Sequence, residues 1–342
     1  MKIKIGLSYD LRNPRGRWWR PYPQLLHDLL DQIATADRLG YDNIWVTEHH
    51  FVEDEYNSSP MTALAAIAAR TERIRIGTFI TLLPFQNPAR YAEDTAFVDN
   101  WSNGRLELGV GQGYRAEEFE KFCIPREERS ARFSESLELL ERLWTEESVS
   151  FEGQFSRCKE VTISPRPVQK PRPPIWIGAR TEKAIKRAAR RGYNLMATIG
   201  PDPAPTYIAA LKENGRNPAD FSIAQAGLMF VAGNRDEAWD ATQEHIHYTM
   251  IHYRKWMSGG GKDLPGDDAI WNLTDPRELR TSRYANGFLV GTPDDVIKKI
   301  EALTKRFSFT NLVLTGHFPG MDVATSTRSI ELFAKEVLPK FH

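Results

Sequence analysis

The ten residues Asp42–Phe51, DNIWVTEHHF, join a β-branched and aromatic run to a cluster of polar and aromatic side chains. The run up to Thr47 predicts a β-strand. Side chains on a strand alternate between its two faces. One face therefore carries Trp45, Thr47 and His49, and the other carries Val46, Glu48 and His50. The two adjacent histidines cannot simply share one site.

Short apolar runs alternate with longer amphipathic segments along the chain, a pattern typical of parallel strands joined by covering helices. The predicted strands are Lys2–Tyr9, Asn43–Thr47, Ile74–Leu83, Leu106–Gly111, Ile175–Gly178, Leu195–Ala197, Ser222–Ala232 and Asn311–Thr315. The predicted helices are Tyr22–Leu39, Met61–Arg70, Pro88–Trp101, Ser130–Leu143, Thr181–Arg191, Pro205–Asn214, Arg235–Met257, Val296–Arg306 and Ala324–Val337. The strand–helix repeat favours an α/β fold of the closed (β/α)8 TIM-barrel type over an open doubly wound sheet.

Two segments interrupt this repeat. Residues 145–174 alternate like strands around Gly153 and then become rich in proline, which predicts a hairpin before the fifth strand. Residues 258–286 include SGGGKDLPGDD and few apolar side chains, which predicts a long loop after the helix of the seventh strand. Because no linker divides the chain, residues 1–342 are expected to form one TIM-barrel domain with two insertions.

The composition narrows the class of protein. The 342 residues include 45 basic and 45 acidic side chains, so the net charge gives no global reason to bind nucleic acid or an anionic membrane. No apolar run approaches the ~20 residues of a transmembrane helix, and the first residues read as a strand, so we expect a cytoplasmic protein. Cys123 and Cys158 lack the spacing of a zinc site and are expected to be reduced thiols.

In a TIM barrel, catalytic side chains come from the carboxyl ends of the strands and from the loops that follow them. The segment Thr47–Phe51 stands at such an end and combines an acid, two imidazoles and an aromatic ring. We therefore expect at least one histidine to line the active site, with structural, hydrogen-bonded histidines as the alternative. A metal site is less favoured, because the helical HExxH spacing is absent.

Two other strand ends carry patterns that favour ligand binding. Three glycines in ELGVGQGY, residues 107–114, would let a bulky ligand approach the backbone closely; the alternative is a tight turn. Gly178 is followed by Arg180 and by a helix that begins near Thr181, and such a helix start favours a phosphate; the alternative is ordinary capping. Together these two ends would suit a mononucleotide-like cofactor.

The loop Arg12–Pro23, RNPRGRWWRPYP, is basic and aromatic. Stacking rings and cations are the features of single-stranded nucleic-acid sites. Because the net charge is zero and no second such patch follows, a substrate-facing aromatic wall or an interface is the favoured interpretation of this loop.

Taken together, the motifs resemble those of the bacterial luciferase-like family of flavin-dependent oxidoreductases. The resemblance covers nearly the whole chain. It rests on GYDNIWVTEHHF, on SPMTALAAIAARTERIRIG with the later NGRLELGVGQGY, on PIWIGARTEKAIKRAARRGY and on FLVGTPDDVIKKIEAL. Members of this family are TIM barrels that bind reduced FMN, or in some branches a deazaflavin coenzyme, at the carboxyl-terminal mouth. The resemblance thus implies the fold that the strand count predicts.

By position, the resemblance implies that His49 is the catalytic residue, with His50 and Glu48 as supports on the other face. It also implies a cis peptide at Phe79–Ile80 against the flavin ring. The implied cofactor-binding residues are Phe79, Ile80, Gly111, Gln112, Gly113, Tyr114, Arg129, Gly178, Ala179, Arg180 and Thr181. Luciferase itself has a cysteine in place of Gly111 and an arginine in place of Gln112. Light emission from an aldehyde is therefore not expected, and the phosphate would rely on Arg180 or Arg129.

The implied activity is that of a flavin-dependent monooxygenase, in which reduced FMN and O2 oxidise a small organic substrate. His49 would donate a hydrogen bond and shuttle a proton, while closure of residues 258–286 would exclude water. A separate NAD(P)H:flavin reductase would supply the reduced FMN, because the chain has no nicotinamide fingerprint. Two alternatives stay open, a deazaflavin-dependent hydride-transfer oxidoreductase and a non-catalytic flavin-binding subunit. A homodimer is the family expectation.

Overall fold

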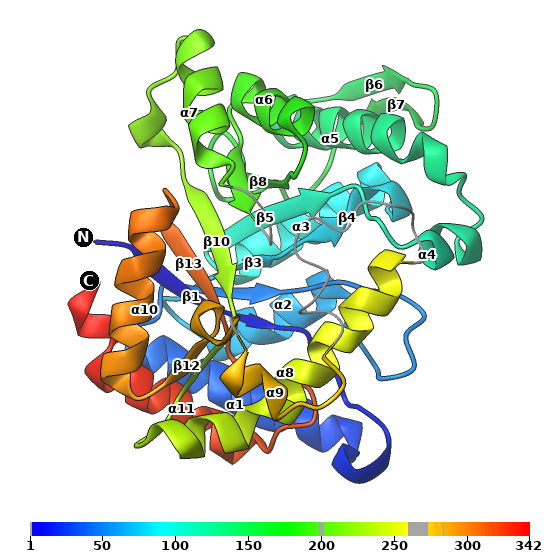
Figure 1. Cartoon of the computed structure of the whole chain (residues 1–342). Helices are drawn as coiled ribbons and strands as arrows, with labels where there is room; N and C mark the ends of the chain where they lie inside the picture. Colours follow the sequence, from blue (N-terminus) through cyan, green and yellow to red (C-terminus); the bar gives the residue numbers. More distant parts are fainter. Residues whose placement is uncertain (1, 198–201, 259–272, 283) are drawn as a thin grey trace.

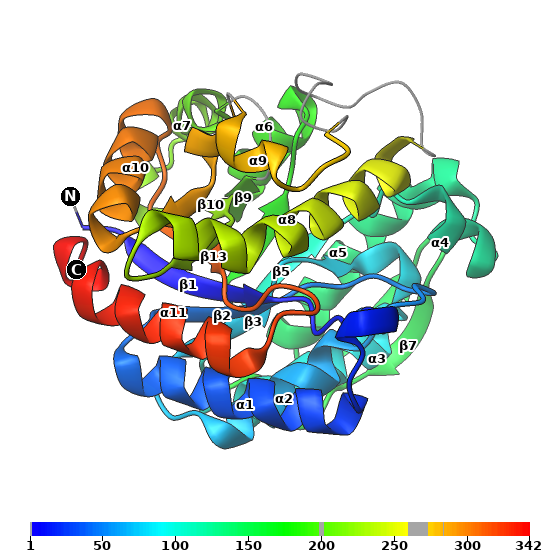
Figure 2. The same cartoon turned by 60° about the horizontal axis from the view of Figure 1, so that its bottom comes forward.

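The computed structural model describes residues 2–197, 202–258, 273–282 and 284–342. Its centre is a closed barrel of parallel strands, wrapped by helices (Figures 1 and 2). The strands of the barrel, in order around the ring, are β1 (Lys4–Tyr9), β2 (Asn43–Val46), β3 (Arg75–Thr78), β5 (Leu106–Gly111), β8 (Ile175–Gly178), β9 (Asn194–Ala197), β10 (Ile223–Gly227) and β13 (Asn311–Thr315). Pairing of β3 with β5 and of β13 with β1 closes the ring, so the TIM-barrel prediction is confirmed.

Helices follow the strands, and most of them cover the outside of the barrel. They are α1 (Tyr22–Leu39), α2 (Pro60–Arg70), α3 (Pro88–Trp101), α4 (Ala116–Lys121), α5 (Arg129–Thr145), α6 (Glu182–Arg191), α7 (Ala204–Glu213), α8 (Arg235–Ser258), α9 (Glu278–Thr281), α10 (Pro293–Arg306) and α11 (Val323–Glu336). Local signals set several ends: the Asn87 side chain accepts hydrogen bonds from Ala89 N–H and Arg90 N–H at the start of α3. Gly40 ends α1 in left-handed backbone, which glycine adopts without strain. The predicted bounds of α1 and α3 match the structure at both ends.

The interior of the barrel is narrow and aromatic. It is filled by Trp45, Trp176, Met196, Ala224 and Val313. The Trp45 and Trp176 rings lie 5.5 Å apart and nearly perpendicular, at 81°. The neighbours of Trp45 along β2 point outward into the layer between barrel and helices, as the alternation predicts. A Cβ at Gly109 would lie 2.0 Å from the carbonyl oxygen of Thr78, so glycine is what leaves room for the adjoining strands.

Two predicted strands are wrong in extent. The segment 74–83 is broken into β3 and β4 (Thr81–Leu82) by the Phe79–Ile80 peptide, which is cis. The segment 222–232 is broken into β10 and β11 (Met229–Val231). The β11 strand leaves the barrel and pairs with β12 (Leu289–Gly291), a strand that sequence analysis missed. Three residues are too few to display a period of two, so β12 carried no readable signal.

The first insertion is a hairpin, as predicted: β6 (Val149–Glu152) and β7 (Arg157–Val161) pair in antiparallel fashion. Most of the second insertion, residues 258–286, lies outside the described residues, and its role as a lid stays a prediction. Its described part contains α9 and a 3-10 turn at Ala285–Gly287. Within the described ranges, no helix is both long and apolar enough to cross a membrane.

The long helix α8 lies across the carboxyl ends of the barrel strands, with its last turns beside α4 (Figures 1 and 2). A second apolar cluster holds it against β11, β12 and the loop after β13. The members of this cluster are Phe230, Ala232, Ala238, Trp239, Ile246, Met250, Leu279, Phe288, Val290, Phe318 and Met321. The helix is therefore anchored from Ala238 to Met250, while its last turns reach over the barrel mouth.

His317, in the loop after β13, makes the stability of this region sensitive to acid. Its ring is buried, and its Nδ1 pairs with Ser326 Oγ at 2.9 Å. Burial, together with the nearby His245 and Arg20, lowers the pKa of His317 to about 3. An unfolded histidine takes up a proton below pH ~6.5, whereas the folded one does not. The stability that the neutral ring contributes is therefore complete above pH ~6.5 and is lost as the pH falls toward the folded pKa.

We predict that His317→Gln, which keeps a donor for Ser326, escapes this loss. The difference in free energy of unfolding between wild type and variant should change by about 2 kcal/mol between pH 6.5 and pH 5, because one group contributes ~1.4 kcal/mol per pH unit. Urea denaturation at each pH measures it, with His27→Gln at an exposed position as control. A difference that stays constant over this range would contradict the prediction.

Candidate active site

His49 and His50 each pair with a carboxylate of their own. His49 is 5% exposed, and its Nδ1 lies 2.8 Å from Glu118 Oε1. The same oxygen accepts the backbone N–H of His50 at 2.8 Å. On the other face, His50 Nε2 lies 2.8 Å from Glu48 Oε1. Because an ionised carboxylate only accepts hydrogen bonds, Glu118 places the proton of His49 on Nδ1 and leaves Nε2 facing the mouth.

Glu118 is a functional candidate that sequence analysis missed. It lies fully buried on α4, in the loop region after β5. Its second oxygen, Oε2, has no hydrogen-bond partner among the described residues. The sequence offers Glu117, Glu118 and Glu120 side by side, and a single chain contains no sign of which one turns inward. Only the direction of α4 relative to the barrel selects Glu118.

Four aromatic rings surround the His49 imidazole, and we call them the aromatic mouth: Tyr56, Tyr114, Tyr253 and Trp256. The Trp256 indole is nearest, with its centroid 4.7 Å from that of the imidazole. The Tyr114 hydroxyl lies 3.3 Å from His49 Nε2. Burial raises the pKa values of the three tyrosines, so they stay neutral hydrogen-bond donors at physiological pH. The imidazole is therefore enclosed by a wall that admits little water.

Three of the predicted cofactor positions meet at the Ile80 side chain. A Cβ at Gly111 would lie 2.0 Å from Ile80 Cδ1, and one at Gly178 would lie 2.9 Å from it. The cis peptide at Phe79–Ile80 thus directs Ile80 against the glycine ends of β5 and β8. Gln112 and Gly113 continue the β5 end toward Tyr114. The structure brings Ile80, Gly111 and Gly178 together from separate segments, and Tyr114 is the predicted cofactor position that contacts His49.

The remaining positions lie around the start of α6. Thr181 caps this helix, since its Oγ1 accepts the N–H of Ala184 at 3.3 Å, and Ala179 is buried just before it. The Arg180 charge acts on Tyr114, where it lessens the rise in that pKa, so the two segments are close. Arg129 instead donates to the carbonyl of Arg126.

Arg126, which sequence analysis did not single out, donates from Nη2 to the Tyr114 carbonyl at 3.0 Å. It therefore contacts the loop after β5, whereas the role of Arg129 in holding a phosphate stays a prediction.

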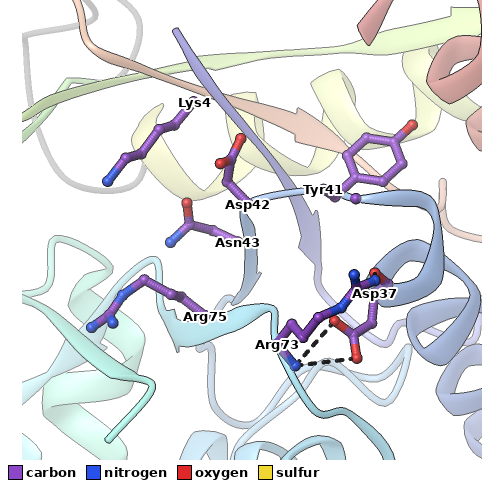
Figure 3. A pocket seen from close by; sticks show the side chains of 8 residues that line it. Lys4, Asp37, Tyr41, Asp42, Asn43, Arg73 and Arg75 are labelled. Atoms are coloured by element: carbon purple, nitrogen blue, oxygen red, sulfur yellow. Dashed lines mark hydrogen bonds between the residues drawn. The ribbon is translucent and has the colours of Figure 1, made fainter. Parts of the chain in front are cut away.

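A hollow of about 320 Å³ lies at the opposite end of the barrel (Figure 3). Lys4, Asn43 and Arg75, which begin β1, β2 and β3, line it together with Asp37 and Arg73. The amino ends of TIM-barrel strands are associated with stability and the carboxyl ends with catalysis. We therefore exclude this hollow from the candidate site. Across the described ranges, no three His, Cys, Asp or Glu side chains converge in a way that would hold a metal ion.

We predict that Glu118→Ala lowers the free energy of unfolding by at least about 2 kcal/mol. The reason is that His49 Nδ1–H and His50 N–H, both bonded to Glu118, would lose their acceptor in a buried place, at about 1–3 kcal/mol each. Urea denaturation measures the effect. Glu120→Ala on the exposed side of the same helix is the control, expected within about 0.5 kcal/mol of wild type. Equal effects of the two substitutions would contradict the assignment.

Comparison with known proteins agrees with this geometry. The model of the luciferase-like monooxygenase family matches residues 12–309. The oxygenase component of the flavin-dependent trigonelline monooxygenase of Acinetobacter baylyi is 32% identical over 339 residues, which cover 93% of this chain and 90% of that protein. An F420-dependent glucose-6-phosphate dehydrogenase of Amycolatopsis mediterranei is 34% identical over 329 residues, which cover 92% of this chain and 94% of that protein.

Solved structures of related proteins share the fold of this chain. The crystal structure of monooxygenase RslO1 from Streptomyces bottropensis superposes with a TM-score of 0.88 at 30% identity, covering 99% of this chain and all of that one. The oxygenating constituent of a Pseudomonas putida 3,6-diketocamphane monooxygenase, in complex with FMN, has a TM-score of 0.82 at 24% identity and shares the fold. Because the family model spans most of the chain and these relatives align along nearly all of it, the chain belongs to the luciferase-like monooxygenase family.

Proposed function

We propose that this protein is a flavin-dependent monooxygenase that uses reduced FMN and O2 to oxidise a small organic substrate. The observation that carries the proposal is the buried Glu118–His49–Tyr114 contact at the barrel mouth. The alignment with the oxygenase component of a flavin-dependent monooxygenase supports it. That relative is one component of a larger system, so a separate NAD(P)H:flavin reductase is part of the proposal.

The residues around Ile80 fit a flat tricyclic ring with a phosphate tail. Ile80 offers an apolar surface between β5 and β8, where it packs against Gly111 and Gly178 because neither carries a side chain. The start of α6 and Arg180 would hold the phosphate, through the helix dipole and a charge-assisted hydrogen bond. Phe79 and Gln112 would complete the cofactor site. When bound, reduced flavin supplies the electrons for activation of O2.

His49 and its neighbours would carry out the proton transfer of the reaction. His49 Nε2 faces the mouth without a proton, so it can take one up from a reacting group and return it later. Glu118 keeps the ring oriented through Nδ1–H and stabilises the imidazolium when Nε2 is protonated. Tyr253 and Trp256 of α8 cover the imidazole and keep bulk water away from it.

Hydride transfer from a reduced deazaflavin is the second candidate, favoured by the 34% identity to an F420-dependent dehydrogenase. Anaerobic titration of the protein with reduced FMN and with reduced F420 separates the two. We expect tighter binding of reduced FMN and rapid O2 consumption once air is admitted. Binding of reduced F420 alone would overturn the proposal in favour of the hydride-transfer enzyme. Binding of FMN without turnover of any substrate would favour a non-catalytic flavin-binding subunit.

We predict that His49→Ala leaves the affinity for reduced FMN within about threefold and lowers kcat for substrate oxidation by about 10²-fold or more, the usual contribution of a positioned proton donor. Flavin fluorescence and product formation, with any substrate that the wild type oxidises, measure the two quantities. His27→Ala, on the outer face of α1, is the control. Unchanged turnover in His49→Ala would reject the catalytic role.

The proposal includes a homodimer. Phe97 and Trp101 lie one turn apart on α3 and are 53% and 63% exposed, so they form an apolar face that a second copy of the chain would cover. Sedimentation of the protein should give twice the mass of the chain. The cytoplasmic location and the single-domain organisation stay predictions from the sequence.

A further inference from the structure

We propose that Arg12 and Asp54 recognise the substrate, and that this substrate is a neutral, flat ring carrying a hydrogen-bond acceptor next to a donor, as a cyclic amide does. The inference rests on the proposed function, because it assigns the substrate side of the same mouth. The fold buries polar atoms of both residues and leaves them without hydrogen-bond partners among the described residues.

Arg12 and Asp54 lie in the loops after β1 and β2, at 0% and 5% exposure. Arg12 Nε donates to Asp54 Oδ2 at 2.6 Å, Arg12 Nη2 forms an ion pair with the same oxygen, and Tyr248 O–H donates to it at 2.8 Å. These three contacts of the Asp54 carboxylate thus fall on one of its oxygens. Arg12 Nη1 and Asp54 Oδ1 have no hydrogen-bond partner among the described residues.

An unpaired buried polar atom is costly, and native proteins hold few of them. Here one donor and one acceptor are unpaired within the same ion pair, in loops that a TIM barrel uses for its active site. The Arg20–Asp28 pair provides the contrast, since both of its side chains remain partly exposed to water. A ligand that accepts from Arg12 and donates to Asp54 would satisfy both atoms of the buried pair.

The pair lies in the aromatic mouth. The Arg12 guanidinium carbon is 5.3 Å from the Tyr56 ring centroid and 5.4 Å from that of Trp256. Trp256 in turn lies against His49. The pair lies in the loops after β1 and β2, whereas most of the cofactor positions lie at or after the ends of β3, β5 and β8. A flat ring that takes the place of the Trp256 indole would touch the pair on one side and the imidazole on the other.

The charges favour a neutral ligand over an anion. Burial by itself lowers the pKa of Arg12, yet the carboxylates of Asp10 and Asp54 raise it above its ordinary value. Burial raises the pKa of Asp10 to about 6, and Arg12 is the main charge that limits this rise. Two acids therefore already face one guanidinium. A further carboxylate would be repelled, whereas a neutral group with one acceptor and one donor adds no charge.

Calorimetric titration of the full chain with 2-pyridone and with N-methyl-2-pyridone tests this inference. The first compound has a ring N–H beside its carbonyl, and the second keeps the ring and the carbonyl but lacks the donor. We expect 2-pyridone to bind at least about tenfold more tightly, because the methylated ring leaves Asp54 Oδ1 unpaired. Equal affinity for the two compounds, or no binding of either, would overturn the proposal and leave bound water as the partner of these atoms.

Two variants test whether the preference for 2-pyridone depends on Asp54. In Asp54→Asn, the amide oxygen would face Arg12 and the NH2 group would face the ligand. Because an NH2 group cannot accept the ring N–H of 2-pyridone, the preference for 2-pyridone should fall to less than about twofold. Asp28→Asn, which removes the carboxylate of the Arg20–Asp28 pair on α1, should keep the tenfold preference. A preserved preference in Asp54→Asn would also overturn the proposal. If Asp54→Asn does not fold, the comparison of the two compounds in wild type still decides.

Quenching of tryptophan fluorescence by 2-pyridone gives an independent reading. It should be weaker in Trp256→Phe, because the ring is proposed to replace that indole. None of these measurements needs flavin. A failure of reduced FMN to bind would therefore count against the proposed function alone, while a failure of the pyridone comparison would count against this inference alone.

Discussion

The carboxylate of Glu118 determines the arrangement of the barrel mouth. One of its oxygens accepts from His49 Nδ1–H and from His50 N–H, so a single buried atom fixes a side chain and the backbone next to it. Without that acceptor the imidazole would be free to turn, and Nε2 would have no fixed direction. The position of His49 beneath the aromatic mouth, and the approach of its Nε2 to the Tyr114 hydroxyl, both depend on this contact.

The mouth is dry, and three basic side chains in it each have an acidic partner. Glu118 with His49, Glu48 with His50 and Asp54 with Arg12 each place an acid against a base out of water. Buried pairs of this kind contribute little net stability, since desolvation offsets most of the attraction. Their value here is geometric, because each pair holds its side chains at a set place in or beside the aromatic mouth. The aromatic rings of α8 close that space and lower its polarity.

Much of the fold was readable because periodicity is a local property. The alternation along β2 predicted that His49 and His50 would separate, and each now pairs with a different carboxylate. The strand count predicted the barrel. The errors share one cause, which is pairing between distant segments. The sequence of residues 74–83 reads as one strand and shows no break at Phe79–Ile80. The strand β12 is too short to recognise by itself and forms only because β11 lies beside it.

The sequence by itself determined which strand ends carry an imidazole, glycines and a helix start, because those features follow from residue order within a few positions. The tertiary structure alone decided which acid reaches His49, that Arg126 contacts the β5 loop, and that the Arg12–Asp54 pair keeps a donor and an acceptor unpaired. Each of these joins side chains from different loops. Their meeting depends on the closure of the ring and on the placement of α4 and α8 across its end, and no local pattern records such distances.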